Sequence, residues 1–195
     1  MNIVPDIINK AVLFYILKFA LIFCVLYFGT LAVIGISAPE GYYNPFIAHN
    51  LNYIDWLRTS LLLAAKKFLL LLGYKTYIAD KYDLYMNSTN GIRIVYSCIG
   101  YGVMSFWAAF VIANTSSWIR KLQWLIGGWL VLWIINVLRI SLLLIAQHKK
   151  WEIPLGLDHH TWFNIAAYFL IFVLIYFYDR SSKVLLLRPE YPKHS

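Results

Sequence analysis

The sequence predicts an all-α polytopic membrane protein with four to five transmembrane helices and a short extracytoplasmic β-hairpin-like segment before Cys98. The chain of 195 residues is 61% hydrophobic and only 13% charged, a composition that one soluble core of this size could not bury. Its apolar residues fall into long runs separated by short polar stretches, as spanning helices require. Lys and Arg lie at the ends of these runs, like headgroup anchors. We therefore do not expect nucleic-acid binding, despite a net charge of +8.

The first predicted span covers residues 12–36, an apolar run long enough to cross a hydrocarbon core of about 30 Å. No signal-peptide cleavage pattern precedes it, so we expect it to remain as a membrane anchor. The next stretch, residues 37–54, contains prolines, a glycine and several tyrosines. It is therefore predicted to be a loop at headgroup level.

Residues 55–74 favour a helix, but Lys66 and Lys67 stand at its middle, where a spanning helix would be strongly destabilised. We interpret this segment as interfacial or re-entrant, with an additional span as the alternative. The helical period is then lost, and residues 76–78 and 91–96 favour extended structure. A small strand or hairpin is expected just before the cysteine.

Three further spans are predicted at about 97–114, 122–146 and 161–178, within a single membrane domain of residues 1–195. The basic tail after residue 179 favours a cytoplasmic C-terminus. The predicted location is therefore the cell inner membrane, crossed several times. In this orientation Cys98, Arg139 and the pair His159 and His160 all reach the extracytoplasmic half.

Arg139 is the most informative of these residues, because an arginine within an apolar helix costs several kcal/mol unless it finds a partner. Asn136 precedes it by three residues and lies on the same helical face. Together they suggest a polar cavity below the membrane surface. The alternative is a structural arginine that extends to the headgroups or pairs with Asp158.

Cys98 lies where the extended segment meets a helix whose first turn contains Gly100. A helix N-terminus favours a thiolate, and a nearby arginine or histidine lowers the thiol pKa further. A glycine at this place lets a substrate backbone approach closely. Taken alone, Cys98 is better explained as a small packing residue, and the catalytic interpretation depends on Arg139 and the histidines beside it. We expect it and Cys24 to be free thiols, because they differ in membrane depth.

His159 and His160 follow Asp158 at the entrance of the last span. The carboxylate could orient an imidazole, and either ring could act as general acid or base. The alternative is a pair of interfacial polar residues. The sequence contains no metal-ligand spacing and no phosphate-binding glycine loop, so no metal or cofactor is implied.

Three motifs in this order resemble the signature of the exosortase/archaeosortase family. They are Cys98-Ile99-Gly100 at the start of one span, Asn136 to Arg139 in the next, and Asp158-His159 at the start of a third. An amphipathic helix followed by short strands before the cysteine is also similar to that family, so the resemblance covers about residues 55–178. The chain would be a short, reduced member.

The resemblance implies a cysteine-type peptidase or transpeptidase, a hydrolase with multiple spans. Its partners would be membrane lipid and exported proteins that carry a C-terminal sorting signal made of a short motif, a transmembrane helix and a basic cluster. By this resemblance Cys98 is the nucleophile, Arg139 stabilises charge, and His159 shuttles protons, with His160 as the reserve candidate.

Two other functions fit the same residues. The chain could be a non-catalytic membrane subunit or scaffold of a secretion or polysaccharide-export system, in which Arg139 and Asn136 make packing contacts. It could also be a small transporter whose Arg139 binds an anionic substrate. Only the peptidase requires the Cys98 thiol.

Overall fold

The computed structural model describes residues 3–37, 44–86, 91–151 and 159–186. The chain is mostly helical, as predicted. In chain order its elements are α1 (Ile3–Ser37), α2 (Pro45–Asn50), α3 (Tyr53–Leu71), β1 (Tyr77–Ala79), β2 (Asp83–Tyr85), β3 (Gly91–Arg93), a 3₁₀ turn (Tyr96–Cys98), α4 (Tyr101–Ala113), α5 (Trp118–His148) and α6 (His159–Leu186).

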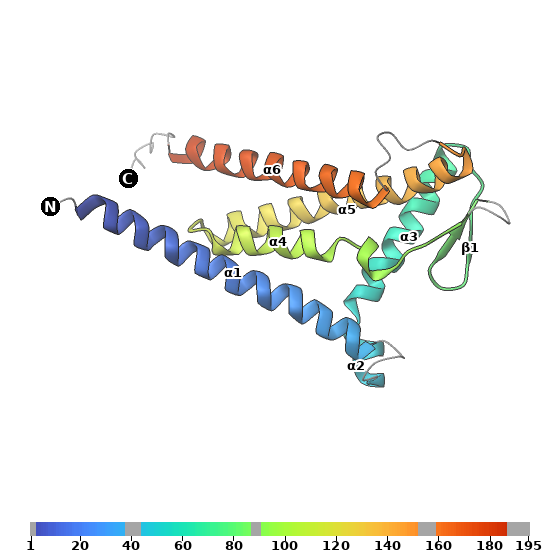
Figure 1. Ribbon diagram of the computed structural model, residues 1–195, viewed down its shortest axis with the longest axis horizontal. Helices are drawn as coiled ribbons and strands as arrows, with labels where there is room; N and C mark the ends of the chain where they lie inside the picture. Colours follow the sequence, from blue (N-terminus) through green and yellow to red (C-terminus); the bar gives the residue numbers. More distant parts are fainter. Residues whose placement is uncertain (1–2, 38–43, 87–90, 152–158, 187–195) are drawn as a thin grey trace, which may run out of the picture.

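Four helices, α1, α4, α5 and α6, run lengthwise beside one another (Figure 1). The start of α1 and the end of α6 lie at the same end of this bundle. The opposite end carries α3, the strands, the start of α4 and the end of α5. The cysteine turn therefore lies at the end of the bundle that α3 and the sheet cover.

Among the described residues, two helices are long and apolar enough to cross a membrane: residues Val12–Ser37 within α1, and α5. α4 is apolar but has 13 residues, about 20 Å of helix, which is less than the thickness of a hydrocarbon core. It begins later than the predicted span at 97–114, because the chain first forms a 3₁₀ turn and a left-handed glycine. The number of membrane crossings stays a prediction.

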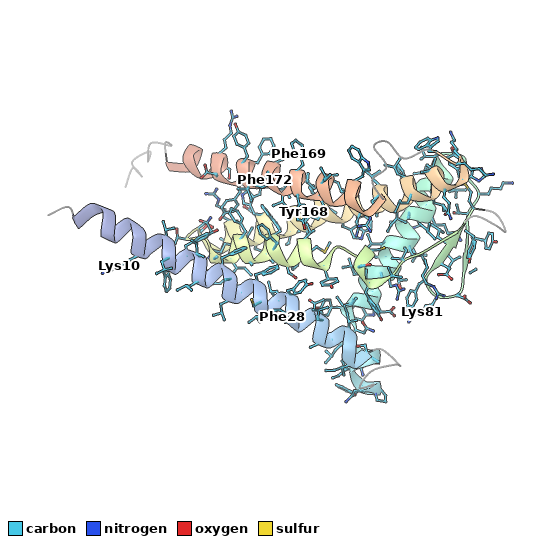
Figure 2. All side chains as sticks on the ribbon, viewed as in Figure 1. Lys10, Phe28, Lys81, Tyr168, Phe169 and Phe172 are labelled. Carbon is cyan, nitrogen blue, oxygen red and sulfur yellow. The ribbon has the colours of Figure 1, made fainter. Side chains whose placement is uncertain are left out.

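The outer faces of α1 and α6 expose large apolar side chains. Phe28 on α1 and Phe169 and Phe172 on α6 are labelled in Figure 2 and are between 60% and 70% exposed. An apolar surface of this extent marks an interaction site in a soluble protein, whereas lipid covers it without penalty in a membrane.

α3 crosses the end of the bundle obliquely instead of running alongside the other helices (Figure 1). One of its faces is buried against α5, where Leu61 and Leu69 share a core with Ile140 and Leu144. The predicted helix at 55–74 is therefore present, with bounds two to three residues earlier. Its depth in the membrane stays a prediction.

The strands before the cysteine form a three-stranded antiparallel sheet in the order β1-β2-β3. Leu84 at its centre is opposite Ile78 on one side and Ile92 on the other, and it is fully buried in the α3 core. The sequence indicated β1 and β3 but not β2, so the sheet is larger than the predicted hairpin. β3 leads directly toward Cys98.

A second core joins α4, α5 and α6 around Trp107, which is fully buried. Its indole nitrogen donates to the Trp124 carbonyl at 3.0 Å. A Cβ at position 128 would lie 1.9 Å from that nitrogen, so Gly128 is required for this packing. The core fixes α4 against α5 and so sets the position of the turn that precedes α4.

Candidate active site

Cys98 is the last residue of the 3₁₀ turn between β3 and α4. Its backbone N–H donates to the Val95 carbonyl at 2.9 Å. The residue is half-buried and packs partly against the α3 core. Cys24 is exposed on α1, and both thiols are free, as predicted. Cys98 thus combines a packing contact with an accessible surface.

Gly100 follows the turn with a φ of +78° and forms the N-cap of α4. This left-handed conformation is strained for any residue with a Cβ. The Asn136 amide lies close by, at 3.4 Å from the place where a Cβ would be. Glycine therefore allows the left-handed backbone that joins Cys98 to α4.

Asn136 holds this turn from α5. Its Nδ2 donates to the Ile99 carbonyl at 2.6 Å, and the side chain is 6% exposed. A buried carbonyl that loses its partner typically costs about 1–3 kcal/mol. The asparagine thus fixes the residue that directly follows Cys98.

Arg139 and Asn136 line one cavity of about 230 Å³ together with Ser97 and Gly100. The Nε and Nη2 atoms of Arg139 are buried. The cavity lining includes Ser97 and Ile99, the two neighbours of Cys98, rather than Cys98 itself. The structure therefore places the arginine beside the cysteine turn, in a mostly apolar cavity to which Arg139, Asn136 and Ser97 contribute polar groups.

α6 also reaches this cavity, through Ala167. His159 and His160 are the first two residues of α6, and eight residues of helix place His159 about 12 Å from Ala167 along the axis. Asp158 and the side chains of both histidines lie outside the described residues. The choice between the two histidines stays a prediction.

Next to the cysteine turn lies a charged and aromatic cluster centred on Arg58 of α3, which the sequence did not predict. Arg58 is 6% exposed, and its Nε donates to the Ile94 carbonyl. Its guanidinium lies over the rings of Tyr82 and Tyr96. The sequence did contain an indication of this cluster, because Arg58 lies on the same helical face as the buried residues of α3.

Asp55 completes this cluster at its exposed side. It accepts a hydrogen bond from Lys81 Nζ at 2.6 Å and another from the Tyr82 hydroxyl. Burial alone would raise the pKa of Asp55, but these hydrogen bonds outweigh it and hold the pKa below its ordinary value. The hydrogen bond to Asp55 also raises the pKa of Lys81. Asp55 therefore remains ionised and orients Tyr82.

A larger apolar groove of about 840 Å³ lies next to the site cavity, between α1, α4 and α5, with the start of α3 at one end. The two spaces share Tyr101 and Met104. Gly29 of α1 lines the groove, and a Cβ there would meet open space. The groove thus lies beside the cavity that the cysteine turn lines.

Comparison with known proteins assigns the family. The family model described as transmembrane exosortase (Exosortase_EpsH) matches residues 12–178. That range covers most of the chain and includes Cys98, Arg139 and both histidines. No curated protein and no solved structure matches the chain. The chain belongs to the transmembrane exosortase family, a family of membrane-bound proteins.

Proposed function

We propose that the chain is a membrane-embedded cysteine peptidase or transpeptidase that cleaves the C-terminal sorting signals of exported proteins. The observation that carries the proposal is the cavity in which Arg139 and Asn136 meet the turn of Cys98. The guanidinium in that cavity supplies positive charge next to the turn that carries the thiol, and a thiol is the nucleophile that the proposed reaction needs.

In the proposed reaction the Cys98 thiolate attacks a peptide carbonyl of the substrate. A C–S bond forms, and the carbonyl electrons move to an oxyanion that Arg139 stabilises. As the C–N bond breaks, His159 donates a proton to the leaving amine, with His160 as the reserve for this role. Water or an acceptor nucleophile then attacks the thioester and restores the thiol.

Three further residues support these steps. Gly100 leaves space for the substrate backbone, since it has no side chain and ends the turn. Asn136 holds the turn through the Ile99 carbonyl. Asp158 orients the catalytic histidine.

The site faces the extracytoplasmic side in this proposal, with the sheet on the same side. The end of the bundle where α1 begins and α6 ends then faces the cytoplasm, in agreement with the basic C-terminal tail. Four transmembrane helices, or five if α3 crosses as well, span the cell inner membrane in this proposal, and we place α3 in the membrane interface. Its exposed residues Leu70 and Leu71 suit that depth.

The proposed partners are exported proteins with a C-terminal transmembrane anchor, together with membrane lipid. The apolar groove beside the site supports this class of substrate, because it adjoins the cavity and Tyr101 and Met104 line both spaces. An anchor helix in the groove would place the adjoining peptide bond near the cysteine turn.

Processing of a candidate substrate in cells tests the proposal, with the product separated on a gel. Cys98→Ala and Arg139→Ala should abolish cleavage at matched protein levels, and one of His159→Ala and His160→Ala should do the same. Cys24→Ala is the matched control, since it removes the other thiol. Unchanged cleavage in Cys98→Ala would refute the thiol mechanism and favour the scaffold function.

A further inference from the structure

The burial of Arg58 needs an explanation, because a buried guanidinium strongly destabilises a fold unless its partners are well placed. The guanidinium carbon lies 3.4 Å from the centroid of the Tyr82 ring and 4.9 Å from that of Tyr96. Cation–π contacts of this kind strengthen when solvent is excluded. The Nε hydrogen bond to the Ile94 carbonyl adds a directional contact.

These contacts all act on the segment that leads into the cysteine. Ile94 follows β3, and Tyr96 begins the 3₁₀ turn that Cys98 ends. Arg58 therefore holds the chain at two points, four and two residues before the thiol. On the other side, Asn136 holds the Ile99 carbonyl, one residue after it.

We propose that Arg58 is a positioning residue for Cys98: it fixes the turn before the thiol in the way that Asn136 fixes the turn after it. Asp55 assists by binding the Tyr82 hydroxyl, which keeps the ring under the guanidinium. The consequence for catalysis rests on the proposed function. The consequence for the thiol does not, since local opening of the turn changes the access of any reagent to Cys98.

The test uses the full chain in detergent with Cys24→Ala, which leaves Cys98 as the single thiol. The rate of Cys98 alkylation by a maleimide is measured for Arg58→Lys. Lysine keeps the charge but lacks the planar group that stacks between two rings while it donates to a carbonyl. We expect alkylation to rise about tenfold, the effect of losing one hydrogen bond to a charged group.

Arg93→Lys is the matched control. It makes the same change one residue before Ile94, in an exposed side chain that pairs with Asp83 at 2.8 Å. Its alkylation rate should equal that of the unchanged protein. An equal rise in both lysine variants would overturn the proposal, because the turn would then respond to any change near β3.

Two changes at Tyr96 keep the test decisive if Arg58→Lys does not fold. Tyr96→Phe retains the ring and should alkylate at the original rate, whereas Tyr96→Leu should alkylate about tenfold faster. Melting temperatures identify variants that are folded. A folded Tyr96→Leu or Arg58→Lys with an unchanged alkylation rate would show that the cluster stabilises the fold without positioning the thiol.

Substrate processing separates this inference from the proposed function. If both hold, Arg58→Lys lowers kcat about tenfold and leaves KM unchanged, because Arg58 is buried away from the substrate. If Cys98→Ala still processes the substrate, the proposed function is wrong, and the alkylation rates still decide whether Arg58 holds the turn. An unchanged kcat in a variant with faster alkylation would overturn the catalytic consequence of the inference.

Discussion

The left-handed glycine before α4 gives a sharp test of how the cysteine turn is held. Gly100 has a φ of +78°, and an alanine in this region is destabilised by about 1–2 kcal/mol. The added Cβ would lie 3.4 Å from Asn136 Nδ2, an ordinary contact that adds little. Gly100→Ala should therefore lower the free energy of unfolding by about 1–2 kcal/mol, or the melting temperature by about 2–8 °C.

The chain provides a matched control at Gly73, which follows the end of α3, has a φ of +86° and has open space around its Cβ position. Gly73→Ala should lose the same stability, since the backbone strain is the same. Melting in detergent and substrate processing are measured for both variants. We expect Gly100→Ala to slow processing about 5- to 30-fold, because about 1–2 kcal/mol lowers the population of the native turn by that factor. Gly73→Ala should leave the rate of processing unchanged.

Two results would refute this reasoning. Equal losses of processing in the two variants would mean that stability alone limits activity and that Gly100 has no local role. A Gly100→Ala protein with an unchanged melting temperature would mean that the turn adopts another conformation without strain.

Three more predictions concern the neighbours of this turn. Asn136→Leu should destabilise the chain by about 1–3 kcal/mol and slow processing, since the Ile99 carbonyl is left unpaired in a buried place; thermal melting and the gel assay measure both effects. Gly29→Trp should raise the KM for an anchored substrate by filling the groove, whereas Gly35→Trp, on the same helix with equally open space but outside the groove, should not. The pKa of Asp55 lies below its ordinary value in the folded chain, so its ionised form stabilises the fold fully above about pH 4, and this contribution is lost as the pH falls further. The melting temperature should therefore decline less steeply between pH 5 and pH 3 for Asp55→Asn than for the unchanged protein. Parallel curves of melting temperature against pH would contradict this role of Asp55.

The sequence predicted the parts of this site that depend on short-range patterns. The apolar runs indicated the long helices, and the three-residue spacing of Asn136 and Arg139 placed both on one face of α5, where they line the same cavity. Gly100 stood out as a glycine beside the cysteine that lets a substrate backbone approach closely, and the structure adds its left-handed conformation. These inferences need only the helical repeat and the steric properties of glycine.

The remaining features depend on contacts between distant residues, which no local pattern specifies. The Nε of Arg58 reaches a carbonyl 36 positions later in the chain, and β2 is recognisable only by its partners on both sides. The groove exists because α1 and α5 flank α4, an arrangement that apolar composition does not determine. The roles of Cys98, His159 and His160 stay predictions.

The placement of Asn136 and Arg139 on one helical turn has a mechanical consequence. Three residues of α-helix rise about 4.5 Å, and backbone hydrogen bonds keep that spacing nearly constant when a helix tilts or bends as a whole. Asn136 ties the Ile99 carbonyl to α5, so the cysteine turn and the guanidinium travel together as one body. Changes in membrane thickness or in the packing of the outer helices can therefore deform the bundle while the distance between the cysteine turn and the guanidinium is preserved.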